Sequence, residues 1–146
     1  MTRSLLLGIV ALAMMGCTEP FITLPGEKLP GDVADPPEDW SAIKDVQVIQ
    51  LETRPDDPYS VNVWLAALGS NLYIATGTDG TNWTVHLLQN KQVRVRIEGI
   101  IYLLEAIAVK DPAERERVVL EYVRKHELDK GDNWVVKGQI FRLDRR

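Results

Sequence analysis

Residues 72–97, LYIATGTDGTNWTVHLLQNKQVRVRI, decide the fold of this chain. The apolar run 72–76 predicts a strand, and residues 82–90 predict a short helix that Thr81 or Asn82 would cap. Residues 93–97 alternate valine or isoleucine with arginine, which predicts a strand with one packed face and one polar face. A strand, a short helix and a second strand therefore lie at the centre of the sequence.

The same kind of pattern continues on both sides of this stretch. Upstream, residues 46–51 and 61–65 predict two strands separated by the turn-rich sequence 54–58, RPDDP. Gly69-Ser70 between the strands at 61–65 and 72–76 predicts a tight hairpin. Downstream, residues 100–109 are apolar enough to predict a strand that is buried on both faces.

A longer helix is predicted after the fifth strand, because its start carries three local signals. Asp111 suits the N-cap, Pro112 suits the first helical position, and Glu114 lies three residues after the cap. Near the end of this helix, His126 is interpreted as a favourable cation at the negative end of the helix dipole. Residues 134–136 and 139–143 predict a last strand.

These elements predict a mainly β fold with some helix. The expected architecture is a small barrel of about six antiparallel strands, with one short and one long helix, because closure removes exposed strand edges. A chain of 146 residues with 45% hydrophobic content is long enough for one such domain, which we assign to residues 40–146.

The first 17 residues resemble a bacterial lipoprotein signal. Met1 to Arg3 carry one positive charge, residues 4–15 are apolar, and Ala13 to Cys17 resemble a lipobox. The apolar run is shorter than the roughly 20 residues that a spanning helix needs. We therefore expect residues 1–16 to be a signal peptide and Cys17, the only cysteine, to be lipidated; a buried free cysteine in an uncleaved helix is the alternative.

Residues 17–39 contain five prolines and no helical or strand period, which predicts a semi-rigid linker between lipid and domain. A proline-rich recognition segment is the alternative. Thr18 is not the aspartate that resembles an inner-membrane retention signal. The sequence thus predicts an exported, membrane-anchored lipoprotein on the periplasmic or surface side, with the outer membrane favoured in a Gram-negative source.

The charge of the chain argues against some partners. Its net charge of −4 and pI near 5.2, without any cluster of basic residues, argue against nucleic acid. No pair of histidines or cysteines with metal-ligand spacing is present, so we predict no metal site.

The central stretch resembles the split β-barrel flavin-binding superfamily, which includes pyridoxamine phosphate oxidases and deazaflavin-dependent nitroreductases. Trp83, Leu87, Asn90 and Val93 keep the spacing of the deazaflavin branch, and the resemblance covers roughly residues 45–143. It implies a split β-barrel that binds FMN or a deazaflavin of the F420 type at a homodimer interface and transfers hydride to a small oxidised compound.

The chain departs from this family where a cofactor phosphate would bind. The family places basic residues before or within the short helix and before the second strand, whereas this chain has residues 79–82, DGTN, and 56–58, DDP. Acids near a phosphate repel it. Arg54, Arg94 and Arg96 could substitute, although a solvated barrel face is the plainer interpretation.

The resemblance suggests three cofactor-binding residues, each with a structural alternative. Trp83 would stack on the ring or fill the barrel core. His86 would polarise a ring carbonyl or serve only structurally. Thr76, beside Gly77, would contact the cofactor, or that glycine simply belongs to a loop. The sequence assigns no catalytic residue.

Two functions therefore follow from the sequence. The first is a tethered flavin- or deazaflavin-dependent oxidoreductase. The second is a non-enzymatic binding or accessory lipoprotein that has kept the barrel and lost the cofactor site, with a small molecule as its expected ligand. The missing phosphate-binding cations favour the second function, as does export away from the cytoplasm where the cofactor is made.

Overall fold

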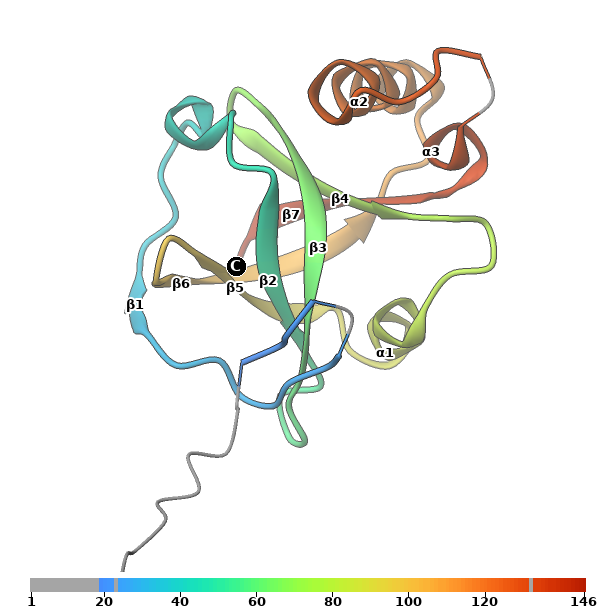
Figure 1. The fold of residues 1–146 in the computed structure, drawn as a ribbon. Coiled ribbons are helices and arrows are strands. Elements are labelled where there is room, and N and C mark those ends of the chain that lie inside the picture. The colour runs from blue at the N-terminus through green and yellow to red at the C-terminus, as the bar shows by residue number, and fades with distance from the viewer. Residues whose placement is uncertain (1–18, 23, 132) are drawn as a thin grey trace, which may run out of the picture.

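A computed structural model describes residues 19–22, 24–131 and 133–146 of the chain (Figure 1). Strands dominate, and helices lie at the barrel periphery. The strands are β1 (Asp32–Ala34), β2 (Val48–Thr53), β3 (Tyr59–Leu68), β4 (Asn71–Thr76), β5 (Gln92–Ile97), β6 (Ile100–Ala108) and β7 (Gln139–Arg145). The helices are a 3-10 turn, η1 (Ser41–Ile43), and α1 (Asn82–Gln89), α2 (Pro112–His126) and α3 (Trp134–Lys137).

Six of the strands close into an antiparallel barrel. Their order is β6-β5-β2-β3-β4-β7, and β7 pairs again with β6, so the ring has no open edge. The hairpin predicted at Gly69 joins β3 to β4, and Gly69 has the left-handed φ of 58° that suits a glycine in a tight turn. The predicted small, mainly β barrel is confirmed.

The barrel interior is filled by the inward-facing side chains of alternate positions along the strands. In β4, Leu72 and Ile74 point into this interior, while Tyr73 and Ala75 point outward and are also buried. Two separate hydrophobic cores explain this double burial. One lies inside the barrel, and the other lies between the outer face of the barrel and the helices α2 and α3.

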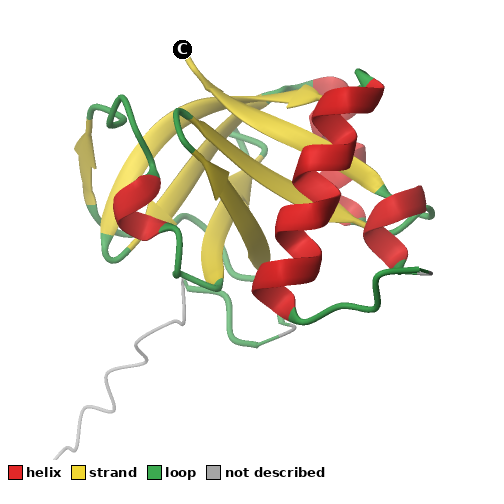
Figure 2. Cartoon of the chain, turned by 90° about the horizontal axis from the view of Figure 1, so that it is seen from above, coloured by secondary structure: helices red, strands yellow, loops and turns green. Residues whose placement is uncertain are grey.

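Helix α2 begins as the sequence predicts. The carboxylate of Asp111 accepts a hydrogen bond of 2.8 Å from the backbone N–H of Glu114, and Pro112 takes the first helical position. Val118 and Tyr122 of α2 are fully buried in the outer core, together with Val135 of α3. Figure 2 shows α2 and α3 together on one side of the barrel strands.

Two predictions about local structure are wrong. Residues 134–136 form the short helix α3 instead of a strand, because the Asn133 side chain accepts hydrogen bonds from the N–H groups of Val135 and Val136. Strand β6 is not buried on both faces, since only Ile101, Leu104 and Ala106 of its nine residues are buried. The apolar composition favoured a strand at residues 134–136 and burial on both faces at residues 100–109, and the cap at Asn133 and the position of β6 in the barrel overrode these preferences.

The linker prediction also needs correction, because the described part of residues 17–39 lies against the barrel. Strand β1 pairs in parallel with the start of β6, and Gly26 exchanges two backbone hydrogen bonds of 2.9 Å with Ser60. Leu29 is 1% exposed. We call residues 19–22 and 24–34 the N-terminal strap. The strap is extended, as its prolines predict, but it is bound to the domain instead of holding it at a distance.

A buried ion pair holds the middle of the strap. Glu52 accepts a hydrogen bond of 2.7 Å from the Leu29 N–H, and its two oxygens lie 2.7 and 3.0 Å from a guanidinium nitrogen of Arg94. Arg94 also donates to the Leu29 carbonyl at 3.3 Å. Both backbone polar groups of Leu29 are thus satisfied by one charged pair that the barrel strands supply.

The predicted signal peptide and Cys17 lie outside the described residues, so the lipidation of Cys17 stays a prediction. Within the described ranges, no helix is long and apolar enough to cross a membrane.

Candidate ligand-binding site

A groove of about 450 Å³ opens between the strap, strand β3 and the start of helix α1. Its walls are mostly apolar, and two amide and two hydroxyl side chains add hydrogen-bonding groups. The residues that line it are Ile22, Leu24, Tyr59, Val61, Asn62, Thr81, Asn82 and Trp83. Small-molecule sites have this size and this mixture of apolar walls with a few polar groups, so the groove is the candidate site.

The start of α1 fixes one wall of the groove. The hydroxyl of Thr84 accepts a hydrogen bond of 2.9 Å from the Thr81 N–H and donates one of 2.8 Å to the Thr81 carbonyl. These bonds hold the first turn of the helix. Thr81 and Asn82 are therefore presented to the groove in a fixed position.

Trp83 belongs mainly to the barrel core. It is 4% exposed and packs edge to face on Phe141, with ring centroids 5.7 Å apart. Only a small part of the indole borders the groove. Trp83 therefore fills the barrel core, which was the structural alternative to cofactor binding. It has no open ring face on which a planar ligand could stack.

His86 lies one turn further along α1 and has different neighbours. Its Nδ1 is 2.8 Å from the Thr53 hydroxyl, and its ring meets the Tyr59 ring edge to face at 4.9 Å. Burial lowers the pKa of His86, and the Arg54 guanidinium lowers it further, while Asp57 opposes this shift. His86 is thus a neutral imidazole near pH 7 that links α1 to the β2–β3 hairpin.

Thr76 is separate from the groove. It is 9% exposed at the end of β4, opposite Gln139 of β7. Gly138 lies so close that a Cβ there would overlap the Thr76 carbonyl oxygen. Thr76 therefore packs against the α3–β7 connection. Of the three cofactor-binding residues predicted from the sequence, only Trp83 lines the groove.

The three arginines that could replace the family's phosphate-binding cations are all paired with acids. Arg54 lies 3.2 Å from Asp57, and Arg96 lies 2.9 Å from Glu19 of the strap. Arg94 is bound to the buried Glu52, as described above. None of the groove-lining residues is a lysine or an arginine. The groove therefore does not fit the phosphate of FMN or of a deazaflavin cofactor.

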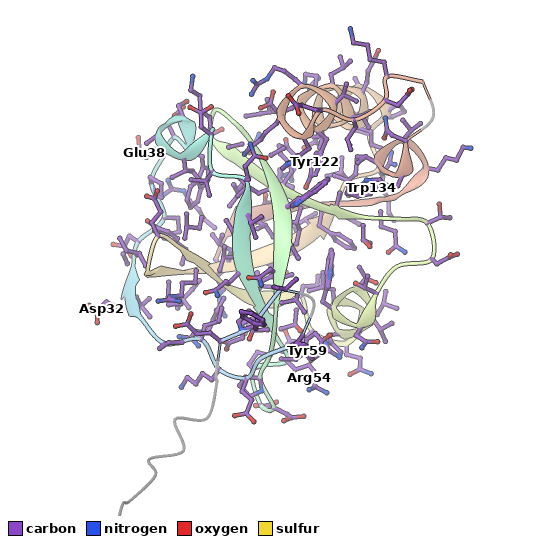
Figure 3. All side chains as sticks on the ribbon, in the orientation of Figure 1. Asp32, Glu38, Arg54, Tyr59, Tyr122 and Trp134 are labelled. Atoms are coloured by element: carbon purple, nitrogen blue, oxygen red, sulfur yellow. The ribbon has the colours of Figure 1, made fainter. Side chains whose placement is uncertain are left out.

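Sequence reasoning missed the residues that matter most around the groove. Tyr59 lines the groove, contacts His86 and carries the Arg54 guanidinium 5.6 Å above its ring. Figure 3 shows Tyr59 and Arg54 at the same end of the barrel. The amide of Asn62 donates to the Ile22 carbonyl at 3.2 Å and so joins the strap to β3. An alternating strand pattern predicts only that such a residue is polar or faces outward. It does not reveal which distant segment the residue contacts.

A second group of aromatic side chains lies on the other side of the barrel, beneath α2 and α3. Trp64 stacks on His126 with centroids 4.5 Å apart and planes 3° apart, and Trp134 lies near both Trp64 and Tyr122. His126 Nε2 lies 3.0 Å from the Leu65 carbonyl, and burial lowers the pKa of this histidine. His126 lies in the last turn of α2 as predicted, but its lowered pKa argues against a role as a helix-terminal cation.

Among the described residues, no group of three histidine, cysteine, aspartate or glutamate side chains could hold a metal ion. The groove is therefore the candidate site, without a metal centre beside it in the described part of the chain.

Comparison with solved structures identifies the fold. A putative pyridoxamine 5′-phosphate oxidase from Listeria innocua superposes with a TM-score of 0.55 at 20% identity, covering 69% of this chain and 85% of that one. An FAD-binding protein from Mesorhizobium loti gives 0.55 at 14%, covering 71% and 84%. A protein described as F420 reductase gives 0.51 at 14%, covering 76% and 95%.

These likenesses show that the chain has the split β-barrel fold shared by flavin- and F420-binding proteins. The resemblance predicted from residues 72–93 is confirmed at the level of fold. No family model matches the sequence, and no curated protein matches it.

Proposed function

We propose that this chain is an exported lipoprotein whose split barrel serves as a binding module at a membrane surface, without a phosphate-bearing flavin. Its ligand in the groove is a small, largely apolar molecule that the amide of Asn82 and the amide oxygen of Asn62 orient, since the Asn62 N–H group donates to the strap. Cys17 carries the lipid, and the barrel faces the periplasm or the cell surface.

The pairing of the arginines is the observation that carries this proposal. A phosphate would have to compete with the carboxylates of Asp57, Glu52 and Glu19 for its cations. Removing Arg94 from Glu52 would also leave a buried carboxylate without its cation and the Leu29 carbonyl without its guanidinium donor, which typically costs about 3 to 5 kcal/mol. The charges near the groove therefore stabilise the fold and the strap.

A flavin- or deazaflavin-dependent oxidoreductase is the second candidate, and the similar structures favour it. Two of them are described as an FAD-binding protein and an F420 reductase. In that function Trp83 would stack on the ring, His86 would polarise it and Thr76 would contact the cofactor, at a homodimer interface. The separation of Thr76 from the groove speaks against this arrangement.

A titration separates the two candidates. The mature chain, residues 17–146, is titrated with FMN and with F420 while its tryptophan fluorescence is followed. We expect no saturable quenching. Saturable quenching, reduced by the aromatic substitution Trp83→Phe and not by Trp134→Phe on the far side of the barrel, would establish the oxidoreductase candidate instead.

The tether is tested separately. The full chain is expressed in a bacterium, the membrane fraction is extracted, and the mass of the mature N-terminal peptide is measured. We expect acyl chains on Cys17 and release of the Cys17→Ser variant from the membrane fraction. An unmodified thiol on Cys17 would refute the tether and would leave the result of the titration unaffected.

A further inference from the structure

Three large apolar side chains are exposed at the start of the strap. Phe21 is 67% exposed, Ile22 is 70% exposed and Leu24 is 63% exposed. We call these three residues the N-terminal apolar cluster. Contiguous apolar side chains that a folded protein leaves exposed are typical of a surface that contacts a partner or a membrane.

The barrel holds this cluster in place. Phe21 and Leu24 exchange backbone hydrogen bonds of 3.1 and 2.7 Å, and the Asn62 amide donates to the Ile22 carbonyl at 3.2 Å. The ion pair between Glu19 and Arg96 fixes the strap just before the cluster. The apolar side chains are therefore presented to the outside by a backbone that is fastened to β3 and β5.

The cluster also lies close in sequence to the proposed lipid. Phe21 follows Cys17 by four residues, so a fully extended chain separates them by at most about 14 Å. A headgroup layer is roughly 5 to 8 Å thick on each side of the hydrocarbon core. A chain anchored through Cys17 therefore has its apolar cluster within reach of the bilayer surface.

We infer that the N-terminal apolar cluster inserts into the outer part of the bilayer and, together with the lipid on Cys17, turns the groove towards the membrane. This inference rests on the proposed tether. The partner is a neutral lipid surface, because the net charge of −4 gives no attraction to anionic headgroups and apolar burial supplies the binding.

The insertion can be measured without relying on lipidation in the cell. Cys17 is the only cysteine, so its thiol in the mature chain can be coupled to a maleimide-headgroup lipid in phosphatidylcholine vesicles. A tryptophan is introduced as Phe21→Trp, and the matched control is Leu120→Trp, which replaces a 61% exposed leucine of α2. Figure 1 shows α2 at the opposite end of the barrel from the strap.

Quenching by brominated phosphatidylcholine then reports contact with the acyl chains. We expect the fluorescence added by Phe21→Trp to be quenched and that added by Leu120→Trp to be spared. Adding Ile22→Ser and Leu24→Ser to the Phe21→Trp chain should reduce the quenching while urea unfolding stays unchanged, because these side chains are exposed. Equal quenching at positions 21 and 120, or none at either position, would overturn the inference whatever the cell does to Cys17.

Discussion

The two sides of this barrel bury polar groups in opposite ways. At the strap, the buried carboxylate of Glu52 pairs with the guanidinium of Arg94, which is 19% exposed, and the pair binds the backbone of a segment 23 residues upstream of Glu52. Beneath α2, the Tyr122 hydroxyl and the His126 ring bind backbone carbonyl groups of β3, and the Tyr122 hydroxyl also lies 3.5 Å from the Tyr73 carbonyl of β4. Figure 3 shows Tyr122 at the end of the barrel opposite Arg54.

This difference determines how much stability each side loses when one polar partner is removed. A charged pair that loses one member leaves a buried charge, whereas a neutral donor that is removed leaves one unsatisfied carbonyl. We therefore expect the strap to be the more fragile attachment. The helices should tolerate comparable changes better, because the apolar core around Val118 and Val135 also holds them.

The largest effect should come from Glu52→Ala. The substitution strands the Arg94 guanidinium and the Leu29 N–H, so we expect the free energy of unfolding to fall by about 3 to 5 kcal/mol. Urea unfolding measures this fall. Release of the strap should also speed cleavage by trypsin after the exposed Lys28.

Asp57→Ala is the matched control for this prediction. Asp57 also pairs with an arginine, but its side chain is 83% exposed, so the loss should stay within about 1 kcal/mol. A Glu52→Ala chain as stable as the control, with Lys28 cleaved no faster than in the unmodified chain, would show that the strap is held by its apolar contacts alone.

A smaller loss is expected on the helical side from Tyr122→Phe. Tyr122 is fully buried, and its hydroxyl donates to the Trp64 carbonyl at 2.9 Å. The ring stays, so only the hydrogen bond is lost, and we expect about 1 to 1.5 kcal/mol in urea unfolding. Tyr102→Phe, at a ring that packs on Trp40, should change stability by less than about 0.5 kcal/mol. Equal losses from both substitutions would assign the effect to packing.

The sequence predicted most of the barrel because its signals are local. Alternating residues in β5, the glycine turn before β4 and the cap at Asp111 each act within a few positions. The strap could not be predicted in this way. It depends on Glu52 and Arg94, which lie 42 positions apart, and no periodicity marks a residue such as Leu29 whose backbone they bind.

The candidate site was predicted only in part for a related reason. The spacing of Trp83 and His86 put them correctly on one short helix, but the chain pattern does not reveal that the Trp83 ring enters the barrel core. Two walls of the groove come from β3 and from the strap. A groove made by three distant segments becomes visible only when their tertiary pairing is known.

The smallest expected change in stability comes from the two histidines. One lies on each side of the barrel, so their titration compares the two sides directly. Burial lowers the pKa of both His86 and His126 in the folded chain, so the unfolded chain binds more protons below the usual histidine pKa. The stability that each neutral imidazole contributes is present above that pKa and is lost as pH falls. Between pH 7.5 and 5.5 we expect the free energy of unfolding to decrease by under about 1 kcal/mol per histidine.

Two measurements check this expectation. His126→Gln and His86→Gln should each flatten the slope of the free energy of unfolding against pH, and NMR titration of the two rings should give midpoints below the usual histidine value. A midpoint above that value for His126 would restore its role as a helix-terminal cation.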